Sequence, residues 1–552
     1  MQRSTVGSVL AKPAVVGRRA REEAVFAAAC ARAGLLRGKS PAALKAVGEA
    51  YVKLGPLGAI FTMSVEADAG RAAAIDDRGT TTFGELDARA NAIANAWRDM
   101  GLRAGDGVGL MLRNHAGFLE VLFACVKTGA KAILLNTAFS GPQLADVAAR
   151  EGTRLLVFDD EFREATEHVD APLGRFRAWT DDPDDASEGT IALLRTGDHR
   201  APAPPERHMS LILLTSGTTG TPKGAARPQP KSLSPFGGPL ARIPLRKREV
   251  TALPAPIFHA TGLIHTLIAV GLADTLILRR RFDPEQTLRD MEEYRATSLI
   301  VVPVMLRRLL DAYDKGGRRE DLSSLRVIFA AGSQLGGALA TRTLDTLGPV
   351  LYNLYGSTEV AMATIASPEE LRQAPDSVGS PVPGTRVRIL DANGHDVAPG
   401  ETGRIFVGTA MPFQGYTGGG TKPLVDGLMA SGDVGHFDEH GLLTIDGRDD
   451  DMIVSGGENV FPGELEELLA GHPKISEAAV IGVDDDEFGQ RLCAYVVLEE
   501  DATLTEDDVR AYAKDNLARY KVPRDVHFLS ELPRNPTGKV LKRELVARRQ
   551  EA

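Results

Sequence analysis

The chain has 552 residues, too many for one simple core, and this length predicts about three or four structural units. Its net charge of −10 excludes a nucleic-acid-binding protein, because such a protein needs a concentrated basic surface. The three cysteines, Cys30, Cys125 and Cys493, lie far apart, which argues against disulfides and favours a cytoplasmic location. No apolar run reaches the ~18 residues that a membrane-spanning helix needs.

Residues 1–60 are predicted to form a helical N-terminal extension. Within residues 20–60, alanine-rich segments place apolar residues at helical spacing. Because the polar face is not markedly basic, this segment is interpreted as a cap on the domain that follows, while peripheral contact with a membrane surface stays open.

Residues 61–449 are predicted to form a large α/β domain. From Thr82 onward, apolar strands alternate with amphipathic helices, and the strands are continuously apolar, as in sheets buried on both faces. Repeated βα units predict parallel sheets. An acidic, proline-rich loop is expected at 181–208, and short strands with glycine turns after Pro381 predict a small β subdomain. Residues 450–552 are predicted to form a small, mobile α+β C-terminal domain.

One loop, TSGTTGTPKG at 215–224, contains many hydroxyls, three glycines and one lysine. It is not a Walker A loop, because Lys223 is followed by Gly224 where that motif needs Ser or Thr. Backbone amides, hydroxyls and a lysine can still hold a polyphosphate. From residue types alone, phosphate binding and an ordinary surface loop both stay open.

Four further motifs follow in order: YGSTE at 355–359, SGDVG at 431–435, GRDDDMIVSGGENVFPGELE at 447–466, and PRNPTGKVLKREL at 533–545. Together with the 215–224 loop, they make the chain resemble the adenylate-forming (AMP-binding) superfamily, and in particular bacterial fatty-acid acyl-CoA synthetases. The resemblance extends from about residue 60 to residue 548. It implies ATP, Mg²⁺ and coenzyme A as cofactors or co-substrates and a small carboxylic acid as substrate.

The resemblance assigns a nucleotide site residue by residue. Glu359 would coordinate magnesium, Thr358 would contact the α-phosphate, and Asp433 would bind the ribose hydroxyls. The remaining ATP-binding residues that it implies are Thr215, Ser216, Gly217, Thr218, Thr219 and Lys223 for the phosphates, Gly332, Ser333, Tyr355 and Gly356 around adenine, and Arg448 beside the ribose.

The same resemblance implies how the second domain takes part. Lys539 would enter the site during adenylation and stabilise the charge that builds at the α-phosphate. Asp450 would be the hinge about which the small domain rotates. Gly456 and Gly457 would then line the path of the CoA arm.

The acyl pocket is expected beside His259, in the segment APIFHATG at 255–262. His259 stands where amino-acid-activating relatives have an aspartate, so an amino-acid substrate is disfavoured. His259 could instead be a structural histidine. Six small residues suggest room for an alkyl chain, and we favour a medium- or long-chain fatty acid: Ala260, Gly262, Ala330, Ala331, Ala361 and Ala363.

Several alternatives stay open at this stage. They are an aryl-CoA ligase, a fatty acyl-AMP ligase that loads a carrier protein, a luciferase-like monooxygenase and an ATP-sensing scaffold without activity. The oligomeric state, a homodimer included, is also open.

Overall fold

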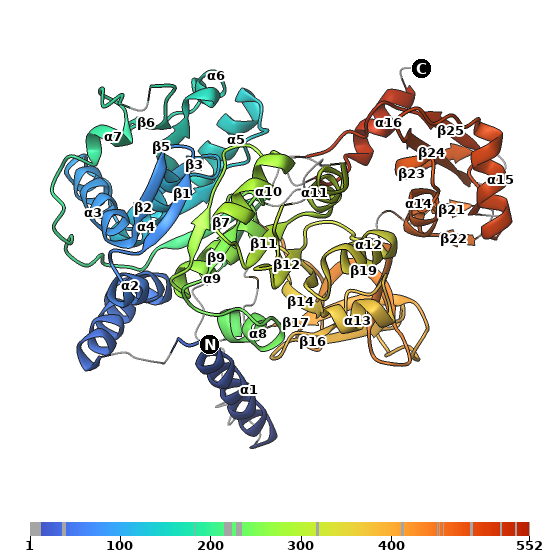
Figure 1. Cartoon of the computed structure of the whole chain (residues 1–552), viewed down its shortest axis with the longest axis horizontal. Helices are drawn as coiled ribbons and strands as arrows, with labels where there is room; N and C mark the ends of the chain where they lie inside the picture. The colour runs from blue at the N-terminus through green and yellow to red at the C-terminus, as the bar shows by residue number, and fades with distance from the viewer. Residues whose placement is uncertain are drawn as a thin grey trace, which may run out of the picture.

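The structure is a computed structural model that describes residues 13–35, 40–182, 184–214, 223–227, 234–315, 320–409, 413, 415–449, 451, 453–455, 458–485, 489–518, 521–535 and 538–550. The chain forms two layered sheets, a small β subdomain and a separate C-terminal α+β domain (Figure 1). The nine-stranded sheet takes strands from both before and after the six-stranded sheet in the sequence. The predicted fold class is therefore confirmed.

The first sheet has the strand order β6-β5-β3-β4-β7-β8, and all its pairs are parallel except β7 with β8. Every residue of β3 is buried, as its continuous apolar sequence predicts. The strand bounds are β3 Gly107–Met111, β4 Lys131–Leu134, β5 Thr153–Asp159, β6 Arg175–Trp179, β7 Ser210–Leu214 and β8 Gly224–Arg227.

The second sheet has nine strands in the order β15-β14-β13-β12-β11-β9-β10-β1-β2, parallel in its centre and antiparallel at both ends. Parallel strands place their carboxyl ends along one edge, where ligands of open α/β sheets bind. The bounds are β1 Ala72–Asp76, β2 Gly79–Thr82, β9 Val250–Ala252, β10 Thr275–Ile277, β11 Ser298–Val301, β12 Val327–Ala330, β13 Leu351–Ser357, β14 Ala361–Ala366 and β15 Ser380–Pro381.

Helices cover and separate the two sheets. All thirteen residues of α4 (Ala116–Thr128) are buried, and together with α9 (Ala260–Gly271) this helix supplies much of the largest hydrophobic core. Thr82 and Glu85 form a capping box that starts α3 where the sequence predicts a helix. The others are α3 Phe83–Asp99, α5 Gly141–Glu151, η1 Asp160–Phe162, α6 Arg163–Thr166, α7 Ile191–Leu194, α8 Ser234–Arg242, α10 Pro284–Glu293, α11 Pro303–Lys315, α12 Gly337–Leu347 and α13 Pro368–Gln373.

The β subdomain is antiparallel, with the order β16-β17-β19-β18 and β20 paired with β19. Its bounds are β16 Arg386–Leu390, β17 Gly403–Gly408, β18 Leu424–Val425, β19 Leu428–Phe437 and β20 Leu443–Arg448.

The C-terminal domain packs α14 (Pro462–Ala470) and α15 (Glu506–Asn516) on its own sheet and core. The sheet order is β22-β21-β24-β23, with β25 paired with β24. The other bounds are β21 Ile453–Ser455, β22 Glu458–Val460, β23 Ile475–Asp485, β24 Gly489–Leu498, β25 Asp525–Phe528 and α16 Lys542–Gln550. This α+β unit matches the prediction from the sequence.

The N-terminal segment forms two helices, α1 (Pro13–Arg32) and α2 (Pro41–Ala67). Helix α2 is kinked at Gly55, directly before Pro56, and then continues through residue 60. The boundary that the sequence suggested between residues 60 and 61 therefore falls inside a helix. Both helices pack on the large domain, α1 against α8 and α2 against α4 and α9.

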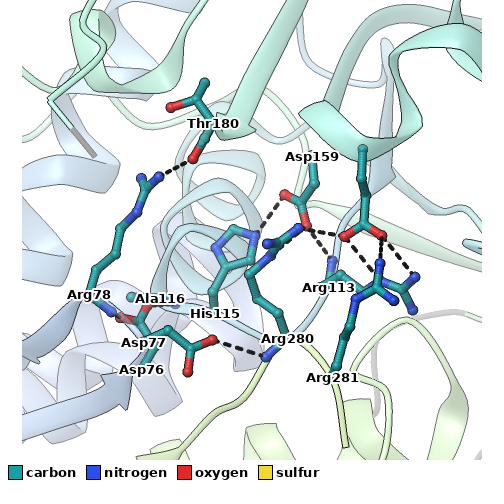
Figure 2. A network of polar contacts seen from close by, with 11 residues as sticks. Asp76, Asp77, Arg78, Arg113, His115, Ala116, Asp159, Thr180, Arg280 and Arg281 are labelled. Carbon is teal, nitrogen blue, oxygen red and sulfur yellow. Dashed lines mark hydrogen bonds and ion pairs between the residues drawn. The ribbon is translucent and has the colours of Figure 1, made fainter. Parts of the chain in front are cut away.

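A polar network joins the two sheets at their carboxyl ends (Figure 2). His115 and Asp159 are almost fully buried and lie 2.8 Å apart (Nε2 to Oδ1), and the backbone N–H of Ala116 donates to Asp76 at the end of β1. Glu161 accepts from Arg113, Arg280 and Arg281. Because acids and bases pair with one another here, the network serves to hold the sheets together.

Asp274, at the start of β10, is a buried acid with a predicted effect on stability. Its Oδ1 accepts from the backbone N–H of Glu249 at 2.9 Å, and burial raises the pKa of its carboxyl to about 8. The folded chain therefore holds a proton that the unfolded chain releases near pH 4, so the free energy of unfolding should fall as pH rises from about 4 to about 8. We expect Asp274→Asn to flatten this slope in chemical denaturation curves recorded at pH 5 and pH 8. An unchanged slope would contradict the assignment.

Candidate active site

A cavity of about 1620 Å³ lies where the carboxyl ends of β12 and β13 face the β subdomain and the C-terminal domain. It is lined by residues from all three parts of the chain. The sequence-predicted residues that line it are Lys223, His259, Gly332, Ser333, Tyr355, Gly356, Thr358, Glu359, Asp433, Arg448 and Lys539. Lys223 and Lys539, which lie 316 positions apart in the sequence, thus line the same cavity.

Asp433 lies at the centre of a hydrogen-bonded group on the wall of the cavity. Its Oδ2 accepts from the hydroxyl of Tyr355 at 2.6 Å, and its Oδ1 lies 3.1 Å from Nη1 of Arg448. Asp433 and Arg448 are direct partners in the antiparallel β19–β20 pair, which explains why they meet. Burial, and then the charge of Asp433, raises the pKa of Tyr355 well above its ordinary value, so its hydroxyl stays a donor.

Ser431, two residues before Asp433 on β19, supports this arrangement. Its hydroxyl oxygen accepts from the backbone N–H of Asp433 at 3.0 Å, and its carbonyl accepts from Lys422. Ser431 is fully buried. A hydroxyl at this position therefore fixes the backbone that presents the carboxylate.

Glu359 is held by two hydroxyl groups. Ser357 donates to its Oε2 at 2.9 Å, and Tyr416 donates to its Oε1 at 2.8 Å. Acceptance of these bonds leaves further lone pairs on both oxygens. A hard divalent cation that keeps waters and phosphate oxygens needs only one or two protein carboxylates, so Glu359 fits Mg²⁺. Within the described ranges, no cluster of three or more metal-ligating side chains offers another metal site.

Tyr416 is a site residue that the sequence analysis missed. Nζ of Lys223 lies over its ring, 5.1 Å from the ring centroid. Its backbone forms a β-bridge with Ala225, which follows the 215–224 loop. Hydrogen bonding to Glu359 and burial raise its pKa, burial being the larger cause. Tyr416 therefore connects strand β8, which follows the 215–224 loop, to the carboxylate of Glu359. The isolated aromatic residue among glycines in GYTGGG was the available signal.

Lys539 reaches the cavity on a turn of the C-terminal domain. Its backbone N–H donates to Oδ1 of Asn535 at 2.9 Å, and its carbonyl accepts from the N–H of Asn535 at 2.9 Å. The neighbouring Gly538 packs against the large domain, where an added Cβ would lie 2.5 Å from Cγ1 of Val304. The turn is thus docked on the large domain, with Lys539 facing the same cavity as Tyr355.

Two further contacts join the domains in this arrangement. Nη1 of Arg307 donates to the carbonyl of Ser476 at 2.8 Å, and Gln334 donates to Glu467. Burial, followed by the nearby charge of Asp376, raises the pKa of Glu467 to about 7. The small domain is therefore held by several polar contacts as well as by the Lys539 turn.

His259 occupies the N-cap position of α9 and lines the cavity. Among the described residues its Nε2 is buried without a hydrogen-bond partner, and burial lowers its pKa to about 4, so the ring is neutral at physiological pH. The Nε2 of His265, six residues further on, likewise has no partner in the described part of the chain, and burial lowers the pKa of this ring to about 4. A neutral imidazole cannot pair with a buried ammonium as an aspartate would, in agreement with the prediction against an amino-acid substrate.

The structure corrects part of the expected acyl pocket. Ala260, Ala331 and Ala361 line the cavity, but Ala330 and Ala363 do not, because they are fully buried in separate hydrophobic cores. Gly262 does line it, yet its small size serves another purpose. A side chain there would overlap the carbonyl of Pro256 in the turn before α9.

Eight predicted site residues lie outside the described residues, and their roles stay predictions. They are Thr215, Ser216, Gly217, Thr218 and Thr219 of the phosphate loop, Asp450 of the hinge, and Gly456 and Gly457 of the CoA path.

The nucleotide site and the two-domain architecture define an enzyme that activates a carboxylate with ATP. Residues 61–417 match the AMP-binding enzyme family and residues 464–539 match the AMP-binding enzyme C-terminal domain, so the chain belongs to the AMP-binding enzymes. It is an AMP-forming CoA ligase of carboxylic acids that uses ATP, Mg²⁺ and CoA. This result confirms the resemblance drawn from the sequence motifs.

Curated relatives act on several kinds of acid. A feruloyl-CoA synthase from Amycolatopsis sp is 34% identical over 86% of this chain and 95% of the relative. An indoleacetate–CoA ligase from Aromatoleum aromaticum is 33% identical over 85% and 94%, respectively. The fatty acid–[acyl-carrier-protein] ligase ScoC from Streptomyces coeruleorubidus is 31% identical over 84% and 91%.

Solved structures show the same architecture. ATP-bound MatB from Rhodopseudomonas palustris superposes with a TM-score of 0.78 at 28% identity, covering 89% of this chain and 99% of that one. The o-succinylbenzoate CoA synthetase from Bacillus subtilis, bound to its acyl-adenylate, has a TM-score of 0.76 at 26% identity, covering 88% and 97%. Among the described helices of this chain, none has the length and apolar character to cross a membrane.

Asp433→Asn should weaken nucleotide binding. The substitution removes the negative charge that pairs with Arg448 and to which the ribose hydroxyls of ATP would donate. Hydrogen bonds to charged groups contribute about 1.5–3 kcal/mol. We expect the KM for ATP to rise by about tenfold or more, with a smaller change in kcat. The reason is that Asp433 would bind the ribose equally well in the ground state and in the transition state. Asp426→Asn is the control, because this exposed aspartate pairs with Arg388 in the same subdomain. A normal KM in Asp433→Asn would contradict the role.

Proposed function

We propose that this enzyme couples a hydrophobic aromatic carboxylic acid, such as an arylalkanoic or cinnamic-type acid, to CoA. The main support is that relatives named for feruloyl, indoleacetate and 2-succinylbenzoate substrates match most of the chain. These names favour an aromatic acid over the fatty acid that the sequence alone suggested. The neutral ring of His259, whose Nε2 has no partner among the residues that the structure describes, supports an uncharged acyl group.

In the first step, a carboxylate oxygen of the acid attacks the α-phosphorus of ATP, and the bond to pyrophosphate breaks. Magnesium bound at Glu359 would neutralise charge on the phosphates. Lys539 would stabilise the negative charge at the reacting phosphate, and Asp433 with Tyr355 would hold the nucleoside. Lys223 would bind the phosphates that leave as pyrophosphate.

In the second step, the small domain would turn about Asp450 and present Gly456 and Gly457 to the CoA arm. The CoA thiol loses its proton to solvent, the resulting thiolate attacks the acyl carbon, and the bond to the phosphate oxygen breaks, so that AMP leaves. The contacts at Arg307 and Gln334 support this proposal, because polar contacts between domains can break and form again when the domains move.

A fatty acid is the second candidate. One observation favours it: the cavity continues into an apolar region formed by Leu211 and Leu213 of β7 and Leu263 and Leu267 of α9. The relative ScoC, named as a ligase of fatty acid and acyl-carrier protein, also supports a carrier protein as alternative acceptor.

The test is AMP and acyl-CoA formation by the full-length enzyme with ATP, Mg²⁺ and CoA. We expect equal amounts of both products, and a kcat/KM for ferulate, indoleacetate or phenylalkanoates at least about tenfold above that for straight-chain acids. A clear preference for straight-chain acids would support the second candidate. Pyrophosphate release without CoA consumption would instead support a carrier-protein acceptor, and no turnover with any acid would reject the proposal.

We also propose a cytoplasmic location. Its support is that Cys30, Cys125 and Cys493 are all buried and none of them forms a disulfide, as expected in a reducing compartment.

A further inference from the structure

The apolar part of the cavity is bounded by one face of a strand and one face of a helix. Met209, directly before β7, and Leu211 and Leu213 on β7 follow at every second residue and line the cavity, while Ile212 points into the opposite core. This face extends for about 13 Å along the strand. The facing wall is α9, which contributes Leu263, Ile264 and Leu267.

The far end of this region can be located along α9. His259 marks the reacting end, and Gly271 ends the helix about 18 Å further on, at about 1.5 Å per residue. Gly271 contacts two side chains, Ile60 of α2 and the ring of Phe236 of α8, each within 3.3 Å of the position of a Cβ. Phe236 itself lines the cavity, and so does Leu57, which lies one turn before Ile60 on α2.

Leu57 and Phe236 therefore line the cavity near the end of α9 that is remote from His259. Both are partly buried and pack against the largest hydrophobic core, as expected of side chains that border a space. Because helix α2 is kinked at Gly55, its second half, which begins at Pro56, turns its apolar residues toward α9.

Helix α1 holds the second of these residues in place. Its Phe26 is 2% exposed and lies against Gly237, the residue after Phe236. Any side chain at Gly237 would overlap Phe26, so the two helices approach as closely as their backbones allow. Helix α1 lies wholly before residue 61, where the match to the AMP-binding family begins, and so does Leu57.

From this arrangement we propose that the N-terminal helices are part of the substrate site. Leu57 of α2 and Phe236 of α8, braced by α1, form an end wall that sets the longest acid the enzyme accepts. The inference rests on the proposed function, since it concerns the acyl group of the same ligase. Its ligand is the end of the acid remote from the carboxylate, an uncharged ring or alkyl chain.

The experiment measures kcat/KM for ω-phenylalkanoic acids and straight-chain acids of increasing length, with ATP and CoA saturating. Leu57→Ala removes most of one side chain of the end wall. The length ratio, which is kcat/KM for the longer acids divided by kcat/KM for the shorter ones, should therefore rise by about tenfold or more. The KM for ATP should stay unchanged, because Leu57 packs against the largest hydrophobic core, whereas Asp433 lies on β19 of the β subdomain. Val52→Ala is the matched control, since Val52 is 74% exposed on the same helix and its removal should leave the ratio unchanged.

Two further variants protect the test against a folding defect. Phe236→Leu, a smaller change in the same wall, should shift the ratio in the same direction as Leu57→Ala. Phe26→Ala, at a residue that does not line the cavity, should allow Phe236 to move and so widen the range of acid lengths that the enzyme accepts. If Leu57→Ala and Phe236→Leu melt normally and keep the wild-type ratio, the inference is wrong. If the wild-type enzyme forms no AMP with any acid, the proposed function fails instead.

Discussion

Replacing Lys539 with alanine is expected to slow acyl-adenylate formation by about 10²–10³, equivalent to about 2.7–4 kcal/mol of transition-state stabilisation. Lys539 faces the cavity that holds Tyr355 and Thr358, on a turn docked against Val304. Its ammonium would act on charge that appears only as the carboxylate attacks phosphorus. The loss should therefore appear in kcat, and binding of ATP should change little.

The measurement separates the two half-reactions. Acid-dependent release of pyrophosphate should be lost in Lys539→Ala, whereas conversion of a supplied acyl-adenylate to the CoA thioester should continue near the wild-type rate. Lys474→Ala is the control, because Lys474 is an exposed lysine of the same domain that donates to a loop carbonyl. Equal losses in both half-reactions would contradict a role specific to adenylation.

Replacing Glu359 with glutamine is expected to lower adenylation by about 10² or more and to raise the Mg²⁺ concentration needed for half-maximal rate. The amide keeps the shape but removes the charge that a divalent cation needs. It also gives Tyr416 an amide group where the structure has a carboxylate oxygen 2.8 Å from its hydroxyl.

Tyr416→Phe separates the charge of Glu359 from its orientation. This variant keeps the carboxylate and removes one hydrogen bond, so a loss of about 1 kcal/mol, or roughly fivefold, is expected. The apparent Mg²⁺ requirement should change less than in Glu359→Gln. If Glu359→Gln keeps a wild-type Mg²⁺ dependence, the carboxylate is not the metal ligand.

Local features of the fold could be predicted because local residues cause them. Thr82 and Glu85 start α3 through a capping box within four residues, and the unbroken apolar sequence of β3 predicts a strand covered on both faces. The order of the five motifs was likewise sufficient to predict the family.

The tertiary structure decided which distant residues are in contact and whether a small residue lines a cavity or packs in a core. Tyr416 bonds to a carboxylate 57 positions away, and nothing in the local pattern of GYTGGG names that partner. Ala330 and Ala363 looked like pocket residues, but apolar composition reports burial without saying whether a core or a cavity covers the side chain.

The sequence by itself determined the α/β class, the succession of domains and the catalytic motifs, because periodicity, caps and turn residues act over a few neighbouring positions. Only the tertiary structure decided that Leu57 and Phe236 close one cavity, or that Lys539 faces the same space as Asp433. Such contacts depend on how distant helices and strands pack, and packing is a property of the whole chain.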